Sequence, residues 1–475
     1  MKIFKNNFIN NVLIALFAQL ISLTASLVLT FVAPKLISVE NYAYWQLFLF
    51  YVTYVNITRF GLIDGIYLRL GGKKYEELDH KNLSLEWLIF VIFQIILAII
   101  LFIFIILSNM NIDRKFVFSC CCFCIVLVNS NNYLSYILQA VNQTKRYSIS
   151  LILQNIPWFI AVILILITQI YSYKIIVIMY ILGHILAGLY LSRYTKKIWQ
   201  VNIKYITKQN INKVIIDIKE NIKCGMFLMI STYAGSLIIG SARIIIDNSF
   251  GVKVFGYFSF ALVLANFILS FINQVSLVIF PEVKRLENNK QKDTYIFVRD
   301  LLSIILPSIL ILYLPICIFV KIWLPQYINS LQYLVYLLPI CIFEGKVQLL
   351  YSTYFKALRE EKLLLIINVI TMIISSIIAF IFSYIYKNIY LVSLGILFVI
   401  SSRSVVSSII ISKKLNIKND YNTYIEYILV ITFILLTLFL DPIISTIIYI
   451  VIYLIYVFIN KRIIHNLINV IKKGK

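Results

Sequence analysis

The chain has 475 residues, of which 61% are hydrophobic and only 13% are charged. A soluble domain carries about a quarter charged residues, so this composition excludes an ordinary soluble protein. The net charge of +23 does not indicate nucleic-acid binding, because the lysines and arginines lie in short segments between apolar runs.

Apolar runs of about 20 residues, the length that crosses a bilayer as an α-helix, recur from end to end of the chain. The first run follows Lys2 and Lys5 as in a signal peptide, but it has no convincing cleavage site, so we expect an uncleaved helix. The pattern predicts an all-α membrane protein with about fourteen transmembrane helices. The expected spans are Val12–Val32, Ala43–Leu68, Trp87–Leu107, Phe116–Val141, Ile149–Ile170, Ile175–Leu191, Met226–Ile246, Phe255–Phe280, Leu301–Val320, Leu334–Phe355, Leu363–Tyr384, Leu391–Ile411, Ile425–Leu440 and Ile443–Ile459.

The basic residues fix the expected orientation of these spans. With fourteen spans, 32 of the 43 lysines and arginines fall on the side that holds both chain ends, and seven fall on the other side. Cytoplasmic loops carry the excess of basic residues, so we expect both termini in the cytoplasm. The last two spans share the tight Asp441-Pro442 connection and should form a helical hairpin.

The sequence also indicates an internal repeat. A shift of 217 residues places Lys145 on Lys362 and Tyr173 on Tyr390, and other identities also coincide with loops. Two six-helix bundles with the same orientation would be related by a pseudo-two-fold axis along the membrane normal. The expected organisation is an N-terminal bundle (1–192), a basic cytoplasmic loop with an interfacial helix (193–224), a C-terminal bundle (225–412), and the last two spans with a basic tail (413–475).

Ionisable side chains inside a bilayer must be paired or hydrated, and they are therefore candidates for function. Arg59 and Arg403 each lie about 13 Å from the cytoplasmic end of their span, at roughly 1.5 Å per residue. The candidate ionisable residues at membrane depth are Arg59, Asp64, His184, Arg243, Asp247, Glu344, Lys346 and Arg403.

Four stretches resemble one family of membrane proteins. The main one is Arg59 to Asp79 (RFGLIDGIYLRLGGKKYEELD). The others are Ser38 to Gln46 (SVENYAYWQ), Gly251 to Pro281 (GVKVFGYFSF to VSLVIFP) and Tyr354 to Lys362 (YFKALREEK). Taken in chain order, they resemble the bacterial polysaccharide flippases of the multidrug/oligosaccharidyl-lipid/polysaccharide (MOP) exporter superfamily.

The resemblance implies a fold like that of multidrug exporters, with a cavity between two bundles, in the bacterial inner membrane. It also implies an undecaprenyl-pyrophosphate-linked oligosaccharide as substrate, such as an O-antigen or capsule repeat unit. Membrane lipids are expected partners, and a polysaccharide polymerase and glycosyltransferases are further candidates. The pyrophosphate needs a cationic passage, for which the candidates are Arg59, Arg243, Lys346 and Arg403.

Structural roles are open alternatives for these residues. Arg243 and Asp247 have the spacing of an ion pair on one helix face. Arg59 and Asp64 are placed to bridge neighbouring helices. Glu344 and Lys346 project about 200° apart, so at least one should pair with another helix.

No motif of a soluble enzyme, ATP-binding loop or dinucleotide site occurs in the sequence, so we expect a transporter without a cofactor. Cys120, Cys121, Cys122 and Cys124 lack metal-site spacing, and no metal is expected. Transport without ATP needs a gradient or the membrane potential, and Asp64 and Glu344 are the candidate ion-coupling carboxylates. A drug/cation antiporter of the same superfamily and a membrane glycosyltransferase or polymerase are the alternative functions.

Overall fold

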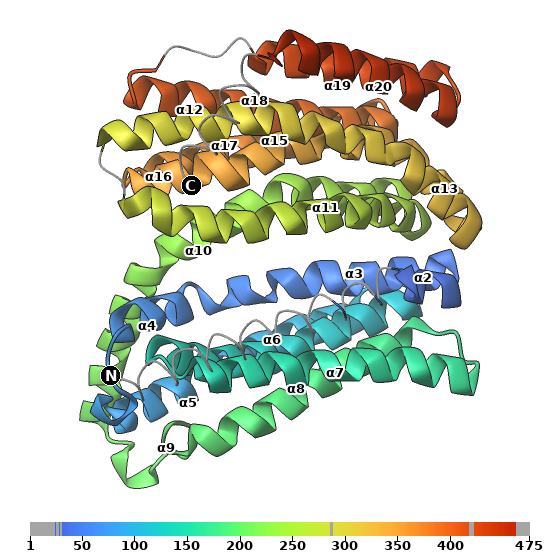
Figure 1. Cartoon of the computed structure of the whole chain (residues 1–475). Coiled ribbons are helices and arrows are strands. Elements are labelled where there is room, and N and C mark those ends of the chain that lie inside the picture. Colours follow the sequence, from blue (N-terminus) through green and yellow to red (C-terminus); the bar gives the residue numbers. More distant parts are fainter. Residues whose placement is uncertain (1–23, 25–27, 29–30, 286–287, 418–421, 462–475) are drawn as a thin grey trace. The chain divides into compact units, whose positions relative to one another are not determined.

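The computed structural model describes residues 24, 28, 31–285, 288–417 and 422–461, and every regular element in these ranges is a helix (Figure 1). The expected first span, Val12–Val32, lies almost entirely outside the described residues. The chain divides into two compact units, Met1–Tyr233 and Ala234–Lys475.

The first unit is built from long helices joined by short turns. Two antiparallel pairs, α5 with α6 and α7 with α8, make its most extensive helix contacts, and α3 lies against α6 and α8. Polar side chains set the helix starts: Ser38, Asp79 and Asn111 each accept a hydrogen bond from a backbone N–H in the first turn of the helix that follows. The elements are α2 (Ala33–Leu36), α3 (Val39–Val55), η1 (Asn56–Arg59), α4 (Leu62–Leu70), η2 (Tyr75–Glu77), α5 (His80–Leu107), α6 (Ile112–Ala140), α7 (Thr144–Thr168), α8 (Tyr173–Tyr194), α9 (Lys196–Trp199), η3 (Ile203–Tyr205) and α10 (Lys208–Phe250).

The second unit begins within α10 and contains more interrupted helices. Its packing centres on α11, which contacts α14, α15 and α16, and on α18, which contacts α15 and α17. The elements are α11 (Val252–Arg285), α12 (Asn288–Ile305), η4 (Leu306–Leu312), α13 (Tyr313–Trp323), η5 (Pro325–Ser330), α14 (Leu331–Leu337), α15 (Ile340–Lys346), η6 (Val347–Tyr351), α16 (Ser352–Ala357), α17 (Glu361–Phe380), η7 (Ile381–Ile385), α18 (Ile389–Lys414), α19 (Asn422–Phe439) and α20 (Pro442–Ile459).

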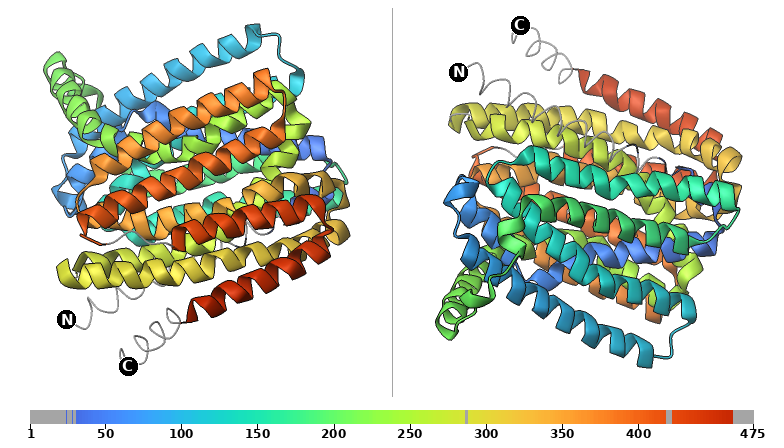
Figure 2. Two further views of the ribbon diagram at one scale, coloured as in Figure 1. Left: turned by 90° about the horizontal axis from the view of Figure 1, so that it is seen from above. Right: turned by 90° about the horizontal axis from the view of Figure 1, so that it is seen from below.

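The predicted all-α, multi-span membrane fold is confirmed. Nine helices of the described chain are long and apolar enough to cross a membrane, or ten if the bent pair Pro325–Leu337 and Ile340–Ala357 is one span. The total of fourteen and the pseudo-two-fold axis remain predictions. The expected terminal hairpin is present, since α19 packs on α20 across the Asp441-Pro442 connection (Figure 2).

A proline explains how α20 is attached to the rest of its unit. Pro307 has no N–H, so the carbonyl oxygen of Ser303, four residues earlier, lacks its usual helical partner. The Tyr456 hydroxyl on α20 donates to that oxygen at 3.1 Å. Tyr453 and Tyr449 donate to the carbonyl oxygens of Ile304 and Pro307, both at 2.9 Å. Three tyrosines of α20 thus satisfy the interrupted backbone of α12 and η4.

The segment expected as an interfacial helix after residue 193 is helical, but it does not end before the next expected span. It forms the first part of α10, which runs for 43 residues from Lys208 to Phe250 and contributes to both units. No proline interrupts this stretch, and Gly225 lies inside the helix. The expected interfacial helix and the expected seventh span are therefore parts of one continuous helix.

Candidate functional site

The second expected span, Ala43–Leu68, is interrupted next to Arg59. After α3, one turn of 3-10 helix leads to Phe60 (φ 49°) and Gly61 (φ 78°), both in the left-handed region, and α4 then begins. Glycine adopts this conformation readily, whereas phenylalanine does so only where its surroundings enforce it. Such a break frees backbone groups that must find partners within the protein when the helix lies in a membrane.

Buried amide side chains supply those partners. The Gln94 amide on α5 donates to the carbonyl oxygen of Thr58 at 2.9 Å, and the Asn129 amide on α6 donates to the Thr58 hydroxyl at 2.8 Å. Asn129 also donates to the Gln94 side-chain oxygen at 2.9 Å. Both amide side chains are fully buried, so the break is held by a polar core within the first unit.

Arg59 and Asp64 lie on the two sides of this break and pair with each other. The Nη2 atom of Arg59 is 3.1 Å from Oδ1 of Asp64, and the residues are only 7% and 8% exposed. The Tyr136 ring lies 5.4 Å from the guanidinium carbon. Nε of Arg59 and Oδ2 of Asp64 are buried and have no hydrogen-bond partner among the described residues. The pair neutralises both charges but leaves some of their hydrogen-bonding capacity unused.

Arg403 and Glu344 form a second such pair, in the other unit. Nη1 of Arg403 on α18 is 3.0 Å from Oε2 of Glu344 on α15, and Arg403 is 7% exposed. The Gln348 amide donates to the other oxygen of Glu344 at 3.0 Å. As with Arg59, Nε of Arg403 is buried without a partner in the described part of the chain.

Lys346 has a different environment. It lies two residues after Glu344 and pairs with Glu426 on α19, which contacts Nζ through both carboxylate oxygens, one of them at 2.6 Å. The two side chains are 1% and 0% exposed. Glu344 and Lys346 therefore both pair with other helices, where at least one was expected to. A turn of π-helix, η6, follows Lys346 directly.

The fourth candidate cation, Arg243, is half-buried on α10. Its Nη2 atom donates to the Ser259 hydroxyl on α11 at 2.9 Å, and its guanidinium carbon lies 5.0 Å from the Phe255 ring. Asp247, one turn further along α10, is 2% exposed. This cation thus contacts a neutral hydroxyl and an aromatic face on the next helix.

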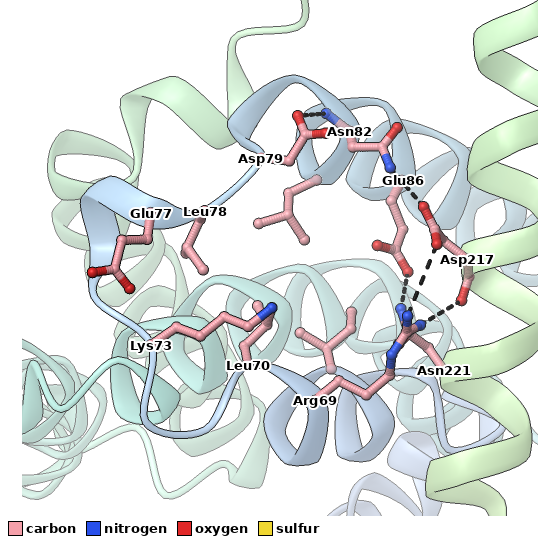
Figure 3. A pocket seen from close by; sticks show the side chains of 12 residues that line it. Arg69, Leu70, Lys73, Glu77, Leu78, Asp79, Asn82, Glu86, Asp217 and Asn221 are labelled. Atoms are coloured by element: carbon pink, nitrogen blue, oxygen red, sulfur yellow. Dashed lines mark hydrogen bonds and ion pairs between the residues drawn. The ribbon is translucent and has the colours of Figure 1, made fainter.

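A pocket of about 240 Å³ lies where α4, α5 and α10 meet (Figure 3). The Asn221 amide donates to Glu86 at 2.8 Å, and its oxygen accepts from Nη1 of Arg69 at 2.8 Å. Arg69 also pairs with Glu220 at 2.9 Å. The other oxygen of Glu86 points into the pocket, towards the side from which Lys73 enters (Figure 3). The lining residues are Ile66, Arg69, Leu70, Lys73, Glu77, Leu78, Asp79, Asn82, Leu83, Glu86, Asp217 and Asn221.

Sequence reasoning missed five of the polar residues in these networks. Glu86 directly precedes one expected span and Glu426 is the second residue of another, and neither is among the candidate ionisable residues, although they are only 3% and 0% exposed. Their position next to an apolar run was the available signal. Gln94, Asn129 and Asn221 are uncharged and give a weaker signal.

One protein-family model matches more than half of the chain. A family model described as polysaccharide biosynthesis protein matches residues 8–287. No curated protein sequence gives a match.

Solved structures with the same fold span nearly the whole chain. A lipid II flippase, MurJ, in an inward closed conformation matches with a TM-score of 0.65 and 16% identity, over 96% of this chain and 99% of that chain. An inward-facing multidrug resistance MATE family transporter of the MOP superfamily matches with a TM-score of 0.56 and 13% identity, over 84% of this chain and 94% of that chain. At these identities the likeness establishes the fold.

Proposed function

Because the chain belongs to the polysaccharide biosynthesis protein family, within the MOP superfamily of transporters and flippases, we propose that it flips a lipid-linked oligosaccharide. The substrate is an oligosaccharide on undecaprenyl pyrophosphate, such as an O-antigen or capsule repeat unit. It moves by alternating access from the cytoplasmic to the outer leaflet of the bacterial inner membrane. Glycosyltransferases would supply this substrate and a polymerase would consume it, while the protein itself acts as a transporter and not as an enzyme.

The proposal rests on one observation: two buried arginines each have a hydrogen-bond donor that no described residue accepts. Arg59 and Arg403 are each held by one carboxylate, and each has a buried Nε–H without a partner among the described residues. Arginine binds two phosphate oxygens at once through its planar fork and keeps its charge at any physiological pH. These properties suit a pyrophosphate that has to cross a region of low dielectric.

The same pairs supply a coupling device. Phosphate and carboxylate compete for one guanidinium, so substrate binding at Arg59 or Arg403 would displace Asp64 or Glu344. A displaced carboxylate in an apolar environment favours proton or cation uptake. Release of that ion on one side of the membrane would restore the pair and expel the substrate. Asp64 and Glu344 are therefore the proposed ion-coupling groups.

Arg243 and Lys346 complete the set of candidate cations, with unequal roles. Arg243 donates to the Ser259 hydroxyl, and a substrate phosphate could replace this hydroxyl as acceptor. Substrate contact at Lys346 would first require the buried pair with Glu426 to open. The proposal consequently rests on Arg59 and Arg403.

Surface-polymer export tests the proposal. Arg59→Ala and Arg403→Ala should each lower export about tenfold or more, since a hydrogen bond to a charged partner contributes about 1.5–3 kcal/mol. Lysine at either position should restore export in part, because it supplies the charge without the fork. The exposed Arg193→Ala serves as the matched control and should export normally.

Protein level in the membrane is measured alongside export. Normal export by both alanine variants, or failure only through loss of the protein, would show that the two arginines are structural. Unchanged polymer export combined with altered resistance to cationic drugs would instead favour the antiporter alternative, which shares the fold.

A further inference from the structure

Helices α4 and α10 approach each other closely enough for their backbones to touch. A Cβ atom on Gly65 would lie 1.9 Å from the carbonyl oxygen of Asn221, and one on Gly225 would lie 2.0 Å from the carbonyl oxygen of Gly61. A Cβ on Gly61 would lie 2.5 Å from the nitrogen of Met226. All three obstructing atoms belong to the backbone, so no side-chain rotation could relieve these clashes.

The glycine contact lies at the ion pair described above. Gly61 separates Arg59 from Asp64, and the atoms nearest to Gly225 belong to Gly61, Asp64 and Gly65. The left-handed turn of the second expected span therefore packs directly against Gly225 of α10. Moving α10 outward would remove the support that keeps Arg59 opposite Asp64.

Asn221, one turn before Gly225, fastens the same contact with side-chain hydrogen bonds. Its oxygen accepts from Arg69 on α4 and its nitrogen donates to Glu86 on α5, both at 2.8 Å (Figure 3). Asn221 is 5% exposed and Glu86 is 3% exposed, so water does not readily replace the bond between them. One amide side chain thus ties three helices together beside the glycines.

We propose that Gly225 and Asn221 of α10 are positioning residues, which act on substrate transport by fixing the broken second span and thereby Arg59. This inference rests on the proposed role of Arg59 in binding substrate phosphate. It assigns a positioning function to a residue without a side chain and to a neutral amide, beside the ion pair that Glu220 of the same helix makes with Arg69.

Export by single and double variants tests the positioning role. Gly225→Ala should lower export at least tenfold, and Asn221→Ala, which introduces no clash, should lower it severalfold. Gly235→Ala on the same helix should export normally, because a Cβ there would lie 3.5 Å from its nearest neighbour. When Arg59→Ala is already present, adding Gly225→Ala or Asn221→Ala should cause no further loss of export. A full additional loss in that background would overturn the proposal, because a merely structural role is additive.

A second measurement is independent of transport. Arg59→Cys is introduced after the seven native cysteines have been replaced, and its labelling by a maleimide is followed over time. Gly225→Ala and Asn221→Ala should raise the labelling rate severalfold, because residue 59 is buried in the intact structure, whereas Gly235→Ala should not. Unchanged labelling with both variants would refute the positioning role. Raised labelling combined with normal export by Arg59→Ala would leave positioning intact and refute the role of Arg59 in transport.

Discussion

The two partners of the Arg59–Asp64 ion pair differ in whether they can lose their charge. A carboxylate left alone in an apolar site can be neutralised by taking up a proton, whereas a guanidinium keeps its charge. Removing one partner of a buried pair costs about 3–5 kcal/mol because the other charge remains buried without compensation. The penalty should therefore depend on which partner is removed.

We expect Asp64→Ala to destabilise the protein more than Arg59→Ala does. Asp64→Ala should lower the free energy of unfolding by about 3–5 kcal/mol, and Arg59→Ala by less, because Asp64 can then become neutral. Thermal unfolding of the detergent-solubilised protein measures the difference. Lys174→Ala is the control, since it disrupts an exposed pair with Asp113 and should cost no more than about 1 kcal/mol. Equal penalties for the two pair variants would contradict this explanation.

At the residue scale, the sequence reveals which charges lie at membrane depth but not what they contact. Arg59, Asp64, Glu344, Lys346 and Arg403 stand out because each interrupts an apolar run. The partners of Arg403 and Lys346 are 59 and 80 residues away in the chain. Local patterns carry no information about such distant pairs, so these partners become visible only in the folded chain.

At the scale of single elements, the apolar runs predict where helices lie but not where they break. The second span reads as continuous, because one glycine in an apolar run usually indicates a tolerated helical position. The break requires Gly61 to be left-handed, and it requires Gln94 and Asn129, from two other helices, to bind the carbonyl and hydroxyl oxygens of Thr58. Pro307 gives a clearer local signal, but its compensation by tyrosines of α20 again comes from far along the chain.

The tyrosine contacts predict a measurable contribution of α20 to stability. Tyr456→Phe leaves the carbonyl oxygen of Ser303 buried without the hydroxyl, which should cost about 1–3 kcal/mol. Tyr424→Phe is the same chemical change at a position that is 67% exposed, and it should be nearly neutral. Thermal unfolding of both variants in detergent compares them directly. A neutral Tyr456→Phe would mean that another group or water satisfies this carbonyl.

At the scale of the whole molecule, the distribution of charge predicts the orientation in the membrane. A single cysteine at Lys204, between the sixth and seventh expected spans, should react with a thiol reagent only from the cytoplasmic side. A cysteine at Lys253, in an expected outer loop, should react only from the opposite side. Both positions are exposed, so accessibility within the protein does not limit the reaction. Labelling of Lys204→Cys from outside would refute the predicted topology and its fourteen spans.

The buried pair between Lys346 and Glu426 has a consequence for how the protein is made. The two residues are 80 positions apart, so at about 5–20 residues per second the ribosome produces Lys346 roughly 4–16 seconds before its partner. Throughout that interval the tenth expected span carries an unpaired lysine, whose insertion costs about 2.5–3.5 kcal/mol at the centre of a bilayer. Stable insertion of the tenth expected span should therefore depend on a helix that is synthesised after it, because α19 brings the carboxylate that neutralises Lys346.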